Sequence, residues 1–304
     1  MRLARPGFDL WPLVLRPDVN SGMLAGRFLM TKAFRVLAVK VELKMQRASN
    51  DNPVIEFRDV VYNLPNGEPL LRGLNLKAQR GETLILLGRS GSGKTTTLKL
   101  INRLLTPSGG EIYVNGTSIA TSDVIRLRRS IGYVIQDAGL FPHFTVERNI
   151  GLVPQIEGWP GERIRARVTE LLKLVGLDSQ LGSRYPYQLS GGQRQRVGVA
   201  RALAADPEIL LMDEPFGALD ALTRDQLQRE FLGLQKRLNK TVVFVTHDLR
   251  EALRLGSRIA LMEGGRLVAV LSPHEFLHSK DPLAAAYVQA FGEGLDSVVD
   301  RGTS

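Results

Sequence analysis

The sequence predicts an α/β protein built on a parallel sheet, and three observations support that fold class. Short apolar runs that end in acidic or histidine residues, "EILLMDE" at 208–214 and "KTVVFVTHD" at 240–248, are typical of buried strands. Between such runs, residues 161–178 carry apolar side chains at helical spacing. A further apolar run at 83–87 leads directly into a glycine-rich loop. Strands that alternate with helices in this way favour a parallel sheet.

Other segments complete the predicted order of elements. Alternating apolar residues at 54–57 and 74–76, separated by turns at Asn66-Gly67 and Arg80-Gly81, predict antiparallel strands before the glycine-rich loop. The helix predicted at 161–178 is closed by Gly176, and "RIALMEGGRLVAV" near the end of the chain is strand-like.

Composition limits the possible function classes. The chain has 304 residues, 43% hydrophobic and 23% charged, as expected for an ordinary globular protein. It contains no uncharged apolar run of about 18 residues that could span a bilayer. The chain has no cysteine, which excludes disulfides and thiolate metal sites.

The net charge of +9 is concentrated at the start of the chain. Residues 1–47 carry nine Lys or Arg against three acidic residues, a net charge of +6, which leaves only +3 for the remainder. Nucleic-acid binding needs a basic surface on the folded domain, so this distribution argues against a nucleic-acid partner. Three interpretations of the leader remain open: an upstream region before a natural start at Met45, a disordered or membrane-surface basic arm, and a targeting peptide.

The glycine-rich loop "GRSGSGKTT" fits the phosphate-loop pattern G-x-x-x-x-G-K-[ST]. Backbone amides of such a loop wrap the α- and β-phosphates of a nucleotide, Lys94 reaches the β- and γ-phosphates, and the Thr95 hydroxyl is available to Mg²⁺. The residues expected to contact the nucleotide here are Gly88, Arg89, Ser90, Gly91, Ser92, Gly93, Lys94, Thr95 and Thr96.

The strand "ILLMDEP" supplies the acids that nucleotide hydrolysis needs. Asp213 at the strand end can hold the Mg²⁺ shell, and the adjacent Glu214 can orient and deprotonate the attacking water. Gln136 after "IGYVI" and His247 after "VVFVT" are polar groups placed to sense the γ-phosphate. We expect catalytic roles for Glu214, His247, Gln136 and Lys94, and metal contacts from Thr95, Gln136 and Asp213.

The stretch "LSGGQ" at 189–193 predicts a second helix start. Ser190 and Gln193 form an S-x-x-Q capping box. The glycines need another explanation, because Gly191 and Gly192 in a first helical turn each cost about 1 kcal/mol relative to alanine. Bare amides at a helix start bind anions, and residues 88–95 already wrap one set of phosphates. The second anion site therefore serves an ATP held by another subunit.

In their order these motifs resemble the ATP-binding subunits of ABC transporters over about residues 54–275. The resemblance identifies an adenine-stacking aromatic (Tyr62), the Walker A loop, the Q-loop Gln136, the signature Ser190, Gly191, Gly192 and Gln193, the Walker B acids, the D-loop "ALD" with Asp220, and the switch His247. It implies a P-loop NTPase core with a parallel sheet, an antiparallel β subdomain and a helical subdomain at about 138–205. It also implies ATP and Mg²⁺ as ligands, and a head-to-tail dimer that sandwiches two ATPs.

A narrower resemblance lies in "GYVIQDAGLFPHFTVERNIGLVPQIEGW", which is similar to importer ATPases for glycine betaine, choline and proline betaine. It implies integral membrane permease subunits that contact this segment, an indirect link to a solute-binding protein, and a peripheral position on the cytoplasmic face of the membrane. Importers of a sulfonate or an amino acid, and soluble ABC ATPases that act on nucleic acid, remain alternatives. We expect an extension at 1–50, an ATPase domain at 51–275 and a short tail at 276–304, too short for a pair of regulatory domains.

Overall fold

The computed structural model describes residues 53–291. These belong to one compact unit that begins at residue 50. The predicted N-terminal extension, the start proposed at Met45 and residues 292–304 lie outside the described residues.

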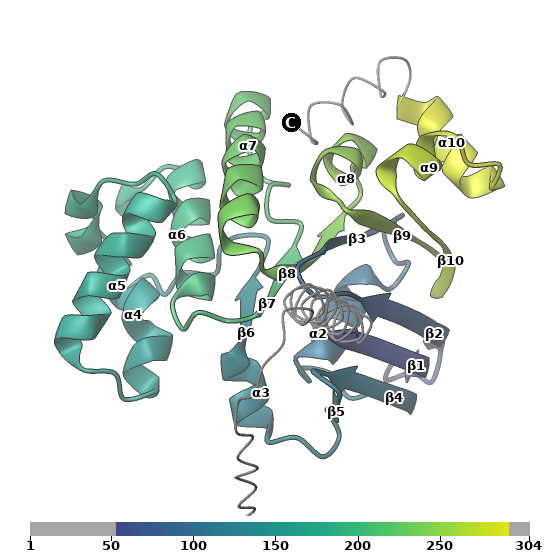
Figure 1. Cartoon of the computed structure of the whole chain (residues 1–304), viewed down its shortest axis with the longest axis horizontal. Coiled ribbons are helices and arrows are strands. Elements are labelled where there is room, and N and C mark those ends of the chain that lie inside the picture. The colour runs from purple at the N-terminus through teal and green to yellow at the C-terminus, as the bar shows by residue number, and fades with distance from the viewer. Residues whose placement is uncertain (1–52, 292–304) are drawn as a thin grey trace, which may run out of the picture. The chain divides into compact units, whose positions relative to one another are not determined.

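A six-stranded sheet forms the centre of this unit (Figure 1). Its strands lie in the order β10-β9-β3-β8-β7-β6, and all neighbours pair in parallel except the hairpin of β9 and β10. The strands are β3 (Thr83–Gly88), β6 (Ile131–Val134), β7 (Ile209–Asp213), β8 (Thr241–Thr246), β9 (Arg258–Glu263) and β10 (Arg266–Leu271). The α/β fold with a parallel sheet is confirmed.

The order of the strands brings three polar segments together. Every residue of β3 and β8 is buried, as their continuous apolar runs predict for strands covered on both faces. β8 lies between β3 and β7, so the carboxyl ends of these three strands are neighbours at one edge of the sheet. The phosphate loop, the acid pair and the switch histidine follow those three ends.

A second, antiparallel sheet has the order β2-β1-β4-β5 and contains the strands predicted before the phosphate loop. Its core joins that of the six-stranded sheet through helix α2 (Lys94–Ile101), whose Leu98, Leu100 and Ile101 are fully buried. The strands are β1 (Ile55–Asn63), β2 (Pro69–Ala78), β4 (Gly109–Val114) and β5 (Thr117–Ser118), and helix α3 (Val124–Ser130) precedes β6.

The helical subdomain contains α4 (Val146–Ile156), α5 (Gly161–Leu174) and α6 (Gly191–Leu203), which lie together beside the sheet in Figure 1. Short 3₁₀ turns η1 (Ser179–Ser183) and η2 (Pro186–Gln188) connect α5 to α6. The predicted closing glycine is confirmed: Gly176 has φ of 68°, a conformation that favours glycine, directly after the end of α5.

The remaining helices α7 (Ala221–Leu238) and α8 (Leu249–Leu255) flank the sheet, followed by α9 (Pro273–Leu277) and α10 (Pro282–Phe291). Phe276 of α9 and Ala284 of α10 are fully buried in the same apolar core as the sheet and α7. Residues 276–291 of the predicted tail therefore pack on the folded unit. Among residues 53–291, no helix combines the length and apolarity needed to cross a membrane.

Candidate functional site

The phosphate loop joins the end of β3 to the start of α2. The Lys94 side chain turns back into this loop, where its Nζ donates to the carbonyl oxygens of Gly88 at 2.7 Å and Arg89 at 2.8 Å. Lys94 is only 6% exposed. Burial lowers its pKa, and the charges of Glu214 and Asp213 oppose that shift. The ammonium is thus held inside the loop, close to two carboxylates.

Two of the loop glycines have backbone conformations that other residues rarely adopt. Gly91 has φ of 80°, with open space where a side chain would begin, and Gly93 has φ of 95° at the N-cap of α2. The hydroxyl of Ser92 is buried and has no hydrogen-bond partner within the described part of the chain. A buried donor without a partner is costly, so this loop fits an acceptor-rich ligand such as phosphate.

Asp213, at the end of β7, meets Thr95 from the first turn of α2. The Thr95 hydroxyl donates to Oδ1 of Asp213 at 2.9 Å, and the Tyr133 hydroxyl lies 3.5 Å from the other carboxylate oxygen. Burial raises the pKa of Asp213, while the Thr95 hydrogen bond acts in the opposite direction. Two of the three predicted metal contacts are therefore adjacent, and both offer oxygen atoms, the ligands that Mg²⁺ prefers.

Glu214 and His247 also meet at this edge. Nδ1 of His247 lies 3.3 Å from Oε2 of Glu214, although the His247 side chain is 65% exposed. Glu214 has φ of 44°, which is strained for a residue other than glycine, and its amide donates to the carbonyl oxygen of Val245 on β8. The Glu214 carboxylate thus lies beside the histidine, while the Glu214 amide stays paired with β8.

Gln136 and Glu214 lie beside the same glycine. A Cβ atom placed on Gly217 would lie 3.6 Å from Oε2 of Glu214 and 3.7 Å from Nε2 of Gln136, so both side chains flank this glycine. Gln136 also lines a cavity with Gly191 of α6 and Ala218. No hydrogen bond joins Gln136 to Asp213 or Thr95 among the described residues.

The capping box predicted at the start of α6 is confirmed. The Gln193 amide donates to Oγ of Ser190 at 3.2 Å, and the Ser190 amide donates to Oε1 of Gln193 at 2.9 Å. A Cβ on Gly192 would lie 2.8 Å from a methyl group of Thr223, and one on Gly191 would lie 3.7 Å from Leu219. These contacts place the signature beside the start of α7, and none of them involves residues 88–95.

Two further predicted nucleotide contacts, Tyr62 and Asp220, lie on other elements. Tyr62 on β1 is half-buried and pairs with Leu71 on β2, whose side chain packs against Gly93 of the phosphate loop. Asp220 caps α7, where its Oδ1 accepts from the amide of Thr223 at 3.0 Å. That backbone hydrogen bond lowers the pKa of Asp220.

Three residues near these groups escaped the sequence-based prediction. Tyr133 contacts Asp213 from the neighbouring strand, and only the strand order reveals it. Asn149 is fully buried and fixes the turn at 141–145 through one accepted and three donated hydrogen bonds. Arg201 of α6 donates to the carbonyl oxygens of Ala138 at 2.6 Å and Gly139 at 2.7 Å. A polar residue within an apolar helical pattern is the only sequence signal for Asn149.

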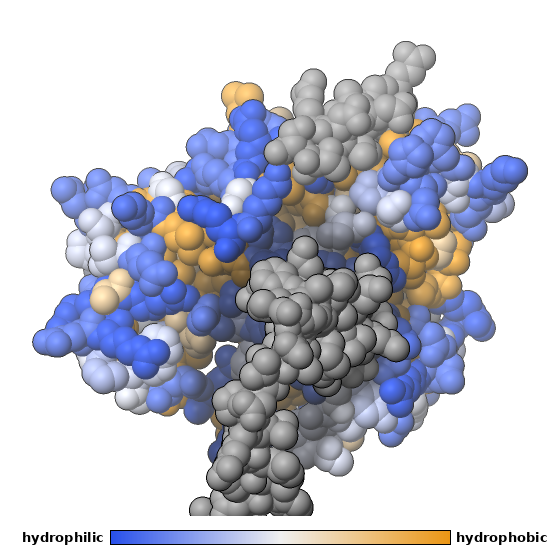
Figure 2. Space-filling model, in the orientation of Figure 1, coloured by the Kyte–Doolittle hydropathy of each residue, from blue (hydrophilic) through white to orange (hydrophobic). Residues whose placement is uncertain are grey.

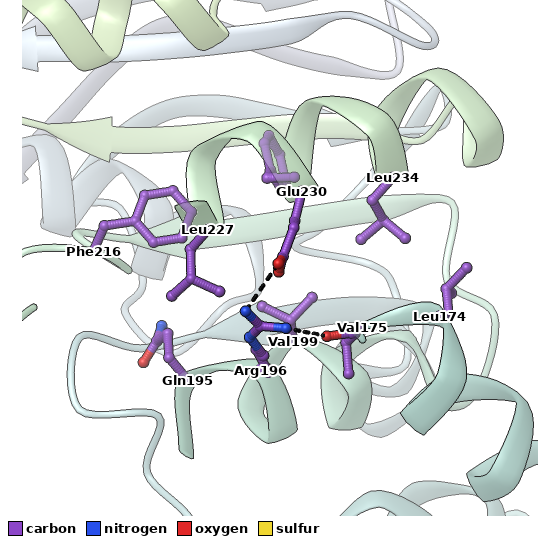
Figure 3. Close-up of a pocket in the computed structure, with 10 residues that line it drawn as sticks. Leu174, Val175, Gln195, Arg196, Val199, Phe216, Leu227, Glu230 and Leu234 are labelled. Atoms are coloured by element: carbon purple, nitrogen blue, oxygen red, sulfur yellow. Dashed lines mark hydrogen bonds and ion pairs between the residues drawn. The ribbon is translucent and has the colours of Figure 1, made fainter. Parts of the chain in front are cut away.

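A separate, apolar cavity lies between α6 and α7, where Figure 2 shows a hydrophobic patch. In Figure 3, Arg196 extends across its mouth to Glu230 of α7 at 2.9 Å and to the carbonyl oxygen of Val175 at 3.1 Å. The cavity includes Phe216 and Leu227 but none of residues 88–95. It belongs to the packing of the helical subdomain against the core, and not to the phosphate loop.

The comparisons with known proteins agree with these motifs. A family model described as "ABC transporter" matches residues 71–217. The chain is 53% identical over 226 residues to a glycine betaine/carnitine/choline transport ATP-binding protein, OpuCA, of Bacillus subtilis, and covers 60% of that protein with 74% of its own length. It is 52% identical over 220 residues to the glycine betaine uptake system ATP-binding protein YehX of Escherichia coli, covering 71% of that protein with 72% of its own length. The chain spans about three fifths of the length of the first curated relatives that it matches.

Solved structures give the same result for the fold. A dimeric, post-hydrolysis structure of the ATP-binding cassette MJ0796 with ADP and Pi is 35% identical, with a TM-score of 0.66 over 72% of this chain and 98% of that one. The structure of cbiO1 from Clostridium perfringens is 29% identical, with a TM-score of 0.70 over 79% of this chain and 96% of that one. With the ordered motifs of residues 62–247, these matches show that the chain belongs to the family of ABC transporter ATP-binding proteins.

Proposed function

We propose that this chain is the ATP-binding and ATP-hydrolysing subunit of an ABC importer for a quaternary-ammonium osmoprotectant such as glycine betaine, choline or proline betaine. One observation supports the ATPase part most directly. The Thr95–Asp213 and Glu214–His247 pairs lie at adjacent strand ends, beside a loop whose buried Ser92 hydroxyl has no partner within residues 53–291. Together they supply a phosphate cradle, oxygen ligands and a base.

Residues 88–96 bind the triphosphate in this proposal. Lys94 exchanges its bonds to the carbonyl oxygens of Gly88 and Arg89 for bonds to the β- and γ-phosphates. The Thr95 hydroxyl, the Asp213 carboxylate and the Gln136 side chain would hold Mg²⁺. When bound, Mg²⁺ neutralises charge that develops on the phosphate oxygens. Tyr62 stacks on the adenine ring.

Glu214 orients and deprotonates the attacking water, and His247 holds the Glu214 carboxylate and the γ-phosphate in register. The contact of 3.3 Å between these side chains supports a shared role. Gln136, which also lies beside Gly217, adds a third polar group near the same point.

A second copy of the chain completes the site. Ser190, Gly191, Gly192 and Gln193 make no contact with the phosphate loop of their own chain, yet the helix start they form is suited to an anion. A head-to-tail dimer places them, with Asp220, against the ATP of the partner copy. The dimeric MJ0796 cassettes support this arrangement by analogy.

The Q-loop segment docks onto integral membrane permease subunits at the cytoplasmic face of the membrane. A groove lined by Ile135, Phe141, Leu152, Val153 and Arg201 lies beside β6 and α4. Phe141 is 42% exposed, although Asn149 fixes its backbone on both sides, so the ring is presented by a rigid turn. The names of the osmoprotectant relatives support quaternary amines as the transported solutes. A periplasmic or lipid-anchored binding protein delivers the solute to the permease.

Uptake in cells tests this function. A strain that lacks the chain should lose uptake of labelled glycine betaine or choline, and the wild-type chain should restore it. Lys94→Ala should not restore uptake, because the change removes the contact to the β- and γ-phosphates. Loss of sulfonate or amino-acid uptake, with unchanged uptake of the quaternary amines, would refute the solute class and leave the transporter function in place. Unchanged uptake of every solute would refute both.

A further inference from the structure

Helix α7 begins directly after the loop that follows Asp213 and Glu214. The first turns of α7 form hydrogen bonds to residues 216–219 of that loop. The Arg224 guanidinium donates to the carbonyl oxygens of Phe216 at 3.3 Å and Leu219 at 3.0 Å. Asp220 caps the same helix. Because the loop is fixed to α7 at two points, a displacement of residues 216–219 moves the start of the helix with it.

One turn further along, α7 carries a buried glutamine that reaches across to α8. Nε2 of Gln228 donates to Oε1 of Glu251 at 2.9 Å, and Oε1 of Gln228 accepts from the Arg254 guanidinium at 3.0 Å. Gln228 and Glu251 are 7% and 5% exposed. Both ends of the Gln228 amide are therefore satisfied inside the protein, where an unpaired polar group is costly.

Glu251 in turn contacts the segment that carries the switch histidine. The Thr246 hydroxyl, at the end of β8, interacts with the Glu251 carboxylate and favours its ionised form. The amide of Asp248 donates to the same hydroxyl at 3.1 Å, and the Asp248 carboxylate accepts from the amide of Glu251 at 3.3 Å. The residues on either side of His247 are thus tied to Glu251.

The His247 side chain depends on this support because it is largely exposed. The His247 ring pairs with Glu214. The backbone of residues 246–248 therefore determines where the ring lies relative to the Glu214 carboxylate. We propose that Gln228 and Glu251 are positioning residues that hold His247 against Glu214 and connect this pair, through α7, to the 216–219 loop. The inference rests on the proposed ATPase function.

A buried polar pair could instead serve stability alone, and the two roles predict different kinetics. If the pair only stabilises the fold, Gln228→Leu lowers the free energy of unfolding, and the folded fraction hydrolyses ATP at the wild-type rate. If the pair positions His247, the folded Gln228→Leu protein keeps its affinity for ATP within about twofold while kcat falls roughly 10- to 100-fold, as expected when a catalytic group is misplaced by about 1 Å.

The matched control is Gln226→Leu, the same change on the same helix, where the side chain is exposed and bonds only to Glu230 among the described residues. Its kcat should equal that of the wild type. Glu251→Gln should retain most activity, because an amide oxygen can still accept from Gln228, whereas Glu251→Leu should match Gln228→Leu. Circular dichroism and nucleotide binding show which variants are folded.

A second measurement isolates the path through His247. Single-turnover hydrolysis with excess protein compares Gln228→Leu in the wild-type and His247→Ala backgrounds. Gln228→Leu should lower the single-turnover rate strongly in the wild-type background. It should not lower the rate in the His247→Ala background, because the histidine that the network positions is already missing. Equal fold losses in both backgrounds, or a wild-type kcat for folded Gln228→Leu, would overturn the inference. Failure of both the wild type and Gln226→Leu to hydrolyse ATP would instead refute the proposed function.

Discussion

Replacement of Glu214 by glutamine should separate ATP binding from ATP hydrolysis. The side chain keeps its size and its place beside His247, where the two groups are now 3.3 Å apart, but it loses the ability to accept a proton. Lys94, Thr95 and Asp213 are untouched, so the phosphate cradle remains. A general base typically contributes about 10²- to 10⁴-fold to the rate, or roughly 3–5 kcal/mol of barrier. We expect kcat to fall by that factor, with ATP affinity changed by less than about twofold.

The unhydrolysed ATP should then hold two copies together. Size-exclusion chromatography with Mg·ATP should give a dimer for Glu214→Gln and mostly monomer for the wild type, which turns its nucleotide over. Glu263→Gln is the matched control, because Glu263 is an exposed glutamate at the end of strand β9, which β3 and β8 separate from β7, and should change neither property. A variant that binds Mg·ATP tightly, hydrolyses none of it and stays monomeric would refute the sandwich arrangement of the site.

Three further predictions address the turn at 141–145, its support by Asn149 and the buried carboxylate of Glu251. Joint substitution of Phe141 and His143 by alanine should leave the ATPase activity of the isolated subunit within about twofold of wild type and abolish uptake in cells; equal losses of both would contradict a docking role. Asn149→Leu should lower the free energy of unfolding in urea by about 2 kcal/mol or more, since it removes the partner of the Phe141 amide and of the Phe144 carbonyl oxygen at about 1–3 kcal/mol each; a change below 1 kcal/mol would contradict this. Burial raises the pKa of Glu251 above its usual 4.5. The folded protein therefore binds more protons than the unfolded chain just above that pH, and its free energy of unfolding decreases as pH rises through this window. Glu251→Gln should make the decrease shallower, as chemical denaturation over a pH series would show, and an unchanged slope would contradict the assignment.

The parts of the fold and site that follow from local pattern were predictable. Continuous apolar runs gave the strands β3, β7 and β8, because a strand covered on both faces needs an apolar side chain at nearly every position. The capping box at Ser190 and the closing glycine at residue 176 depend on neighbours within a few residues, so a short stretch of sequence contains the whole signal.

The parts that depend on strand order or on contacts between distant helices were not predictable. Tyr133 reaches Asp213 only because β6 pairs with β7, and the positions are far apart along the chain. Gln228 looks like an ordinary polar residue of an amphipathic helix until α8 brings Glu251 against it. The expected proximity of Gln136 to Thr95 and Asp213 also depends on how the Q-loop folds, and here the glutamine lies beside Gly217 and near Glu214.

Some groups of the proposed site are fixed within one chain, whereas the signature helix start needs a second copy, and this difference bears on how hydrolysis can be controlled. Strand ends and contacts inside one chain hold five of these groups, so their arrangement does not require a second copy: Lys94, Thr95, Asp213, Glu214 and His247. The signature helix start lies beside Leu219, which precedes α7, and Thr223 in the first turn of α7. In the proposed dimer, a partner nucleotide that displaced the signature would also displace the start of α7, which contacts Gly192 through Thr223 and carries Gln228, the partner of Glu251. In this proposal, one chain contains both the groups that hydrolyse its own ATP and a series of contacts through which the second ATP can change their alignment.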